Sequence, residues 1–270
     1  MQNISKKEID NALKQINFKK NSCYVVHSSL VHIGIANGVK INKMPEVILN
    51  ILKKNFGKNS TICVPSSNWD YADRKINFDK EKSNSHREFG ALSHYLTKKP
   101  NSFRSNNPLF NITAIGKKAK FITEGGTSNG FGVDSAWDKL YNLDADIVLL
   151  GCDFSEATFT FTRYIEFRFG VPYLYNKLFN VPITQKGKKQ FNNSISTLRY
   201  LNLDVIYDLE NFKKILKKNK ILVENKNKKI KITKVKMKPC FDVGIRCLKK
   251  DINFFLKRKP KYKIDKFPLK

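Results

Sequence analysis

The chain has few acidic residues and no long apolar run. It contains 23 Asp and Glu against 51 Lys and Arg in 270 residues, which gives a net charge of +28. The longest apolar stretch, residues 147–152, is far too short for a transmembrane helix. The N-terminus, MQNISKKEID, lacks the apolar segment of a signal peptide. We therefore expect a soluble, cytoplasmic protein without a membrane span.

Cysteine is also scarce, and its spacing excludes two kinds of site. The five cysteines are odd in number and form no C-x-x-C pair, so neither a disulfide framework nor a zinc site is expected. We predict reduced, mostly buried thiols and no metal. The five are Cys23, Cys63, Cys152, Cys240 and Cys247.

Several common catalytic motifs are missing as well. The chain has no GxxxxGK[ST], GxGxxG, HExxH or GxSxG segment and no internal repeat. The common kinds of kinase, dehydrogenase, zincin and serine hydrolase are therefore not supported.

The positive charge is concentrated near the C-terminus. Residues 211–270 hold 22 Lys and Arg against 4 Asp and Glu, a net charge of +18. Such a surface favours polyanionic partners, which include nucleic acid, anionic membranes, nucleotide-bearing metabolites and acidic carrier proteins. A lysine-rich genome with simply solvated side chains explains the same composition.

Hydrophobic periodicity predicts helices and strands in irregular alternation, which indicates a mixed α/β or α+β fold. Ser5 and Glu8 match a capping box at the start of the first helix. Helix and strand patterns fit residues 158–169 equally well. The predicted helices cover 5–17, 44–56, 88–98, a short stretch from 117, a stretch after 205, and 242–256; the predicted strands cover 23–27, 61–65, 110–114, 144–151, 221–223 and 229–237.

Two segments carry side chains suited to chemistry. His27-Ser28-Ser29-Leu30 follows a strand and enters a turn, where exposed amides and hydroxyls can bind a phosphate. Thr160, Arg163 and Glu166 are spaced by three residues and would share one face of a helix. There Arg163 and Glu166 can form an ion pair, although surface pairs of this kind are common without any function.

Seven segments in order resemble one family. They are VVHSSLVHIG, CVPSSNWDY, FGALSHYL, RSNNPLFNITAIGKKA, DSAWDKLYNLDADIVLLG, TFTRYIE and GVPYLYNK, and they span about residues 23–177. Each is weak alone, but the ordered series is specific. The series resembles the antibiotic N-acetyltransferase family, to which aminoglycoside 3-N-acetyltransferases belong.

The resemblance implies that family's own α/β fold, which is distinct from the GNAT fold, and acetyl-CoA as acyl donor. Residues 1–205 would bind acyl-CoA and carry out catalysis, residues 206–258 would be a smaller C-terminal α/β portion of the same domain, and 259–270 a basic, disordered tail. The resemblance also implies a set of acyl-CoA contacts. These are Ser28, Ser29, Leu30, Ile33, Gly34, Pro65, Ser66, Arg104 and Ser105.

The chain departs from the family at its catalytic motif, Thr-x-x-His-x-x-Glu. Thr160 and Glu166 keep their places, but Arg163 replaces the histidine that takes the proton of the amine, and Asn107 replaces a second family histidine. Arginine stays protonated at neutral pH and cannot act as a general base. The site is therefore redirected, or the chain is a weakly active member, or Arg163 is an engineered inactivation.

If the site is redirected, three residues are candidates for the general base: Glu166, His27 and His86. His27 is also a candidate structural hydrogen-bonder, and His86 a candidate substrate contact. Arg163 itself can stabilise a negative tetrahedral intermediate or bind an anionic substrate.

The acceptor is predicted to be the amine of an amino sugar. A strongly cationic protein matches a polycationic aminoglycoside poorly, so we expect a nucleotide-linked amino sugar of glycan biosynthesis, with Tyr173 and Tyr175 stacking on it. The family's default, an aminoglycoside in antibiotic resistance, is the alternative. An acyl carrier protein as donor and a homodimer are compatible with the sequence. A catalytically silent acyl-CoA binder and a nucleic-acid-binding protein are further alternatives, the last without a recognised motif.

Overall fold

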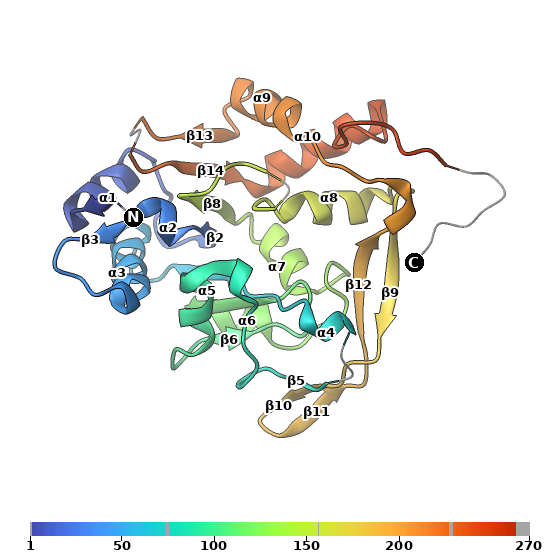
Figure 1. The fold of residues 1–270 in the computed structure, drawn as a ribbon, viewed down its shortest axis with the longest axis horizontal. Helices are drawn as coiled ribbons and strands as arrows, with labels where there is room; N and C mark the ends of the chain where they lie inside the picture. The colour runs from blue at the N-terminus through green and yellow to red at the C-terminus, as the bar shows by residue number, and fades with distance from the viewer. Residues whose placement is uncertain (1, 74–75, 156, 227–228, 263–270) are drawn as a thin grey trace.

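A central β-sheet organises the protein. The computed structural model describes residues 2–73, 76–155, 157–226 and 229–262. Within them, seven strands form this sheet (Figure 1). From edge to edge they are β13 (Leu222–Glu224), β14 (Ile232–Lys236), β8 (Asp146–Leu150), β2 (Cys23–Ser28), β4 (Thr61–Pro65), β7 (Ile112–Gly116) and β6 (Phe103–Arg104).

The three middle strands of the sheet run parallel. β2 pairs with β8 and with β4 in this direction, and Val25 lies opposite both Ile147 and Cys63. The flanking strands β14 and β7 are antiparallel to their neighbours. The carboxyl ends of β2, β4 and β8 therefore open at one edge, where α/β proteins bind ligands.

Helices cover both faces of the sheet, because successive strand residues point to opposite sides. Tyr24 and Val26 pack on one face, and Cys23 and Val25 on the other. The first face packs against α1 (Lys6–Lys14), α3 (Met44–Phe56) and α5 (Gly90–Thr97). The second packs against α6 (Ala119–Thr123), α7 (Ala136–Asn142), α8 (Phe161–Phe169), α9 (Glu210–Lys218) and α10 (Met237–Lys250).

Small strand pairs and short helices complete the fold. In Figure 1, β9 (Leu174–Phe179) and β12 (Ser194–Arg199) run side by side as an antiparallel pair away from the end of α8. The hairpin of β10 (Ile183–Gln185) and β11 (Lys188–Phe191) pairs with β5 (Phe78–Asp79). The remaining elements are β1 (Asn3–Ile4), β3 (Ile35–Ala36), α2 (Leu30–Ile33), α4 (Asp70–Asp73) and the 3-10 helices Ile41–Lys43, Arg87–Phe89 and Leu201–Leu203.

Local sequence signals are confirmed at several elements. The Ser5 hydroxyl accepts a hydrogen bond from the Glu8 amide at 3.1 Å, and Glu8 Oε2 accepts one from the Ser5 amide at 2.8 Å, so the capping box is present. The bounds of α3 and β4 agree with the predicted ones. Residues 161–169, left between helix and strand, form α8.

The last predicted helix is wrong at both ends. α10 begins at Met237 rather than at 242 and ends at Lys250 rather than at 256. Pro239 lies in its first turn, where a missing N–H costs nothing. Residues 255–257 instead bond to the chain before α9, since the Asp208 amide donates to the Phe255 carbonyl and the Lys257 amide to the Ile206 carbonyl.

Residues beyond 205 are built into the same sheet as the rest. β14 pairs with β8 along its whole length, from Ile232 opposite Leu150 to Lys236 opposite Asp146. The division of the chain at residue 205 into a larger catalytic region and a smaller C-terminal portion stays a prediction. Most of the tail predicted at 259–270 lies outside the described residues. Among the described residues, no helix combines the length and the apolar character needed to cross a bilayer.

Candidate active site

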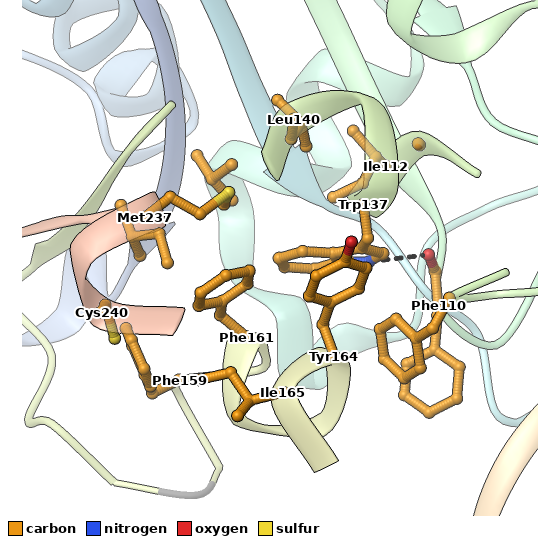
Figure 2. Packing of buried hydrophobic residues seen from close by; sticks show 14 of the residues in the cluster. Phe110, Ile112, Trp137, Leu140, Phe159, Phe161, Tyr164, Ile165, Met237 and Cys240 are labelled. Atoms are coloured by element: carbon orange, nitrogen blue, oxygen red, sulfur yellow. Dashed lines mark hydrogen bonds between the residues drawn. The ribbon is translucent and has the colours of Figure 1, made fainter. Parts of the chain in front are cut away.

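α8 is fixed in place by an aromatic core. The Trp137 indole of α7 is fully buried and donates to the Phe110 carbonyl at 3.2 Å, and Tyr164 stacks on Phe161 with ring centroids 5.4 Å apart (Figure 2). The Tyr164 hydroxyl donates to Asp138 Oδ1 at 2.7 Å. These contacts determine which face of α8 turns away from α7, and the candidate catalytic residues lie on this helix.

The motif Thr160-Arg163-Glu166 lies at the start of α8, so of the two conformations left open for this segment the helix is the one formed. Thr160 is the N-cap residue, immediately before the first helical residue Phe161, and Arg163 and Glu166 follow about one and two turns later. Arg163 Nη1 lies 3.6 Å from Glu166 Oε2, which confirms the predicted ion pair. The Glu166 side chain is fully buried, while that of Arg163 is 14% exposed. The pair therefore joins a fully buried carboxylate to a largely buried arginine, so it is not an ordinary surface ion pair.

Two tyrosine hydroxyls donate to the Glu166 carboxylate. Tyr173 reaches Oε1 at 2.8 Å, and Tyr207 reaches Oε2 at 3.1 Å. Burial, with Glu166 as neighbour, raises the pKa of Tyr173 far above its usual value, so its hydroxyl stays a donor. Sequence reasoning assigned Tyr173 to the substrate. The structure places it beneath Glu166 instead, fully buried, and a substrate contact has no support there.

Tyr207 is the site residue that sequence reasoning missed. The Arg163 guanidinium carbon lies 4.2 Å from the centroid of the Tyr207 ring, and Nη1 donates to the Tyr207 hydroxyl. Tyr207 lies between β12 and α9 in a segment without any motif. Its isolated bridge to Leu256 and the backbone bonds of residues 206 and 208 to residues 257 and 255 hold it in place.

His27 is a buried, neutral histidine on β2. It lies opposite Leu149 of β8 and shares the sheet face of Val25, which is the face covered by α8. Burial lowers the pKa of His27 to about 3. Among the described residues its Nε2 atom has no hydrogen-bond partner. A histidine with so low a pKa is a weak base, and its role in catalysis remains a prediction.

The predicted acyl-CoA loop follows β2 at the open edge of the sheet. The Ser28 hydroxyl is buried without a hydrogen-bond partner among the described residues, while the Ser29 hydroxyl lies 2.8 Å from His32 Nδ1. Leu30 and Ile33 belong to α2. Gly34 has a φ of +100°, and a Cβ there would lie 2.3 Å from the Gln2 carbonyl. The backbone of Gln2, immediately before β1, thus already explains the glycine, and a ligand contact there remains a prediction.

The residues predicted on the neighbouring strands form a buried network. Arg104 donates to Asn111 Oδ1 at 3.1 Å, to the Ser66 carbonyl at 3.2 Å and to the Ser83 carbonyl. The Ser66 hydroxyl, next to Pro65, donates to Asn111 Oδ1 at 2.7 Å. The Ser105 hydroxyl accepts from the Ile112 amide at 2.9 Å. Arg104 and Lys80 also line a cavity of about 290 Å³. These hydrogen bonds stabilise the open edge of the central sheet. Contact of the same side chains with acyl-CoA remains a prediction.

The two remaining substrate candidates lie on separate elements. His86 precedes the 3-10 helix Arg87–Phe89, and its Nδ1 is 3.5 Å from Glu88 Oε2. Its amide donates to the Ser67 carbonyl at 2.8 Å, so it adjoins the segment after β4. Tyr175 lies on β9 and stacks on Tyr200 with ring centroids 4.6 Å apart. Neither contact tests a substrate role.

Asn107, which replaces a family histidine, joins two loops to β12. Its amide nitrogen donates to the Ser128 and Ile195 carbonyls, each at 2.8 Å. Its amide oxygen accepts from the backbone amides of Leu109 and Phe110 at 3.0 and 2.8 Å. A histidine lacks this combination of two donors and a carbonyl acceptor. Asn107 therefore has a structural role, because its amide group joins these backbone segments by hydrogen bonds.

Replacing Asn107 by alanine should destabilise the protein by about 2 kcal/mol, because buried backbone amides lose their acceptor. The measurement is the free energy of unfolding from denaturant titration. Asn176→Ala is the control, since its amide oxygen accepts one partly buried hydrogen bond, from the Thr197 hydroxyl at 2.8 Å. Equal losses in both variants would show that Asn107 is not a special junction.

No group of three His, Cys, Asp or Glu side chains suited to a metal ion occurs in the described part of the chain. The five cysteines are all free and buried. The candidate site at α8 comprises the Glu166 carboxylate, the hydroxyls of Tyr173 and Tyr207, and the Arg163 guanidinium.

Comparisons with known proteins agree on one family. The family model described as aminoglycoside 3-N-acetyltransferase matches residues 25–249. A Bacillus subtilis protein, the SPbeta prophage-derived aminoglycoside N(3')-acetyltransferase-like protein YokD, is 28% identical over 207 residues, 68% of this chain and 72% of its own length. Aminoglycoside N(3)-acetyltransferase III of Salmonella sp. is 25% identical over 171 residues, 57% of this chain and 58% of its own length.

Solved structures of the same kind share the fold. AAC-IIIb in a binary complex with CoASH superposes with a TM-score of 0.75 at 17% identity, covering 96% of this chain and 100% of that one. A mutant of AAC(3)-IVa in complex with a gentamicin gives 0.76 at 19% identity, with 96% and 93% covered. AAC-VIa bound to sisomicin gives 0.74 at 15% identity, with 92% and 98% covered. The predicted fold is confirmed.

Proposed function

The chain belongs to the aminoglycoside 3-N-acetyltransferase family, and from this premise we propose that it transfers an acetyl group from acetyl-CoA to an amine of an aminoglycoside-type sugar. One observation carries the proposal. The family model spans 225 of the 270 residues, and inside that span the motif glutamate, Glu166, is kept as a fully buried, hydrogen-bonded carboxylate on α8.

The relatives support the donor and the acceptor class. A structural neighbour is a complex with CoASH, and two others hold a gentamicin and sisomicin. They favour the aminoglycoside alternative over the nucleotide-linked amino sugar that the net charge suggested. At the site itself the positive charge is locally balanced, since Arg163 is paired with Glu166. A global charge of +28 therefore does not by itself exclude a cationic acceptor.

The site residues suit acyl transfer without a histidine at position 163. A neutral amine is already a good nucleophile, so positioning and stabilisation of the developing oxyanion supply much of the rate. Arg163, held by Glu166 and stacked on Tyr207, presents a fixed positive charge for that oxyanion. The Ser28 hydroxyl, buried at the end of β2, has no hydrogen-bond partner in the described part of the chain, and we infer that it can bond to the pantetheine arm.

The test is thiol release from acetyl-CoA with a panel of aminoglycosides, comparing the wild-type chain with Arg163→His. We expect the wild type to turn over at least one aminoglycoside and the histidine variant to do no better. Turnover by the histidine variant alone would mean that position 163 has lost its catalytic residue. If both proteins bind coenzyme A and neither turns over, the proposed acceptor class is refuted. The second candidate function, a catalytically silent acyl-CoA binder, would then remain. The arginine at the position of the family's base favours this second candidate.

Three further sequence-based expectations accompany this proposal. A cytoplasmic location, a homodimer and an acyl carrier protein as donor rest on composition and on the resemblance alone. The +18 charge of residues 211–270 is compatible with an acidic carrier. Replacing acetyl-CoA by an acetylated carrier protein in the same assay tests the donor directly.

A further inference from the structure

We propose that the Tyr207 hydroxyl is a catalytic proton relay, which takes the proton of the acceptor amine and delivers its own proton to Glu166. The inference rests on the proposed function, since it needs an acyl transfer to an amine at this site. Its starting point is the contact of Tyr207 with two members of the motif: Arg163 Nη1 donates to the Tyr207 hydroxyl, which itself donates to Glu166 Oε2 at 3.1 Å.

Burial excludes direct contact between the acceptor and Glu166. The carboxylate is fully buried on α8, so a substrate amine at the protein surface cannot touch it. Of the two hydroxyls that donate to Glu166, that of Tyr173 belongs to a fully buried residue as well. Tyr207 is only partly buried. Tyr207 is therefore a partly exposed residue that is hydrogen-bonded both to the buried carboxylate and to Arg163, the side chain that replaces the family's base.

The electrostatic setting suits a proton passing through a tyrosine. A phenol that gives up its proton bears a negative charge on oxygen for a moment, and a hydrogen bond from a cation stabilises that charge. The Arg163 guanidinium supplies this bond and lies over the Tyr207 ring, 4.2 Å from its centroid. Arg163 thus positions and polarises the relay without accepting a proton, which arginine cannot do.

The steps balance without another reactant. The amine nitrogen attacks the thioester carbon, and the carbonyl electron pair moves to oxygen to give a tetrahedral oxyanion. A proton on the now positively charged nitrogen passes to Tyr207 Oη while the Tyr207 proton passes to Glu166 Oε2. The oxyanion collapses, the C–S bond breaks, and coenzyme A is expelled as thiolate. The proton on Glu166 then returns through Tyr207 to the thiolate. Coenzyme A is released as the thiol, and the Glu166 carboxylate is regenerated.

The histidines fit this task less well. Burial lowers the pKa of His27 to about 3, and a base this weak gives little help at neutral pH. His86 lies beside the segment after β4, where its amide bonds to Ser67. Neither has a contact with Arg163 or Glu166 in the hydrogen bonds described above. The Tyr207 hydroxyl is hydrogen-bonded to both Arg163 and Glu166.

The test compares Tyr207→Phe with Tyr173→Phe, each in the full chain, using the aminoglycoside that the wild type acetylates. Both changes remove one hydroxyl from Glu166 and keep the ring, and only Tyr207 contacts Arg163. We expect Tyr207→Phe to lower kcat about 100-fold with KM for acetyl-CoA unchanged, since general-base help is typically worth about 10²- to 10⁴-fold. Tyr173→Phe should lower kcat less than about tenfold, because proton transfer is left intact.

A second measurement does not depend on how the variants fold. In mixtures of H₂O and D₂O, a relay moves two protons together, so the wild-type rate for the acceptor should follow a curved rather than a linear proton inventory. A linear inventory, or a Tyr207→Phe enzyme with nearly full kcat, would overturn the relay. So would equal losses in the two variants. A wild type that acetylates no amine would instead refute the proposed function, and the relay with it.

Discussion

Replacing Arg104 by leucine is expected to lower the free energy of unfolding by about 3–5 kcal/mol, because buried oxygens that lose their donor cost about 1–3 kcal/mol each. Arg104 is 3% exposed, and its guanidinium donates to Asn111 Oδ1 and to the Ser66 and Ser83 carbonyls. It also lies 4.8 Å from the centroid of the Phe78 ring. One side chain thus joins four segments around the open edge of the sheet. Urea titration measures the loss.

Arg87→Leu is the matched control for this change. Arg87 is exposed on a 3-10 helix near the same loop, so its loss should change stability by less than about 0.5 kcal/mol. The resemblance to the family implies a different role for Arg104, a contact with acyl-CoA. A leucine variant of wild-type stability with weaker coenzyme A binding would favour that role over the structural one.

His27 should make the protein lose stability as the pH falls from 8 to 5. Its pKa is about 3 in the folded chain, against an ordinary value of 6.5, because burial disfavours the charged ring. The unfolded chain therefore binds more protons than the folded chain between pH 6.5 and pH 3, and stability decreases on acidification through that range. The loss attributable to His27 is about 2 kcal/mol between pH 8 and pH 5, at about 1.4 kcal/mol per pKa unit.

The variant His27→Leu isolates this effect, since leucine fills the buried site and cannot titrate. Unfolding free energies of both proteins are measured by urea titration at pH 8 and at pH 5. The wild type should lose about 2 kcal/mol more than the variant over this interval. Parallel losses would mean that the folded chain can protonate His27, for instance because water reaches Nε2.

Elements with strong local signals were predictable from the sequence. The Ser5–Glu8 capping box marks the start of α1, and Gly57, with a φ of +101°, ends α3 where expected. β2 and β4 are short apolar runs that lie in the middle of the sheet, buried from both sides. These signals act within a few residues, so a single sequence reveals them.

Elements that depend on distant partners were not predictable. The strands β10, β11 and β12 are polar and alternate weakly, and they are held by pairing with β5 and β9. α7 is short, and its N-cap Ser135 follows a loop without a clear period. In the site, the motif located Arg163 and Glu166, and the ion pair followed from helical spacing. Tyr207 had no such signal, because its place depends on tertiary structure alone.

The bridge between Tyr207 and Leu256 implies an order of events during synthesis. β14 cannot pair with β8 until more than 80 residues have followed β8 out of the ribosome, and the segment of Tyr207 is held by residues 255–257, which are synthesised later still. Contacts so far apart in sequence form late. The candidate site around Tyr207 therefore cannot be complete before residues 255–257 have been synthesised, and a chain shortened before residue 255 would lose the backbone contacts that hold the segment of this tyrosine.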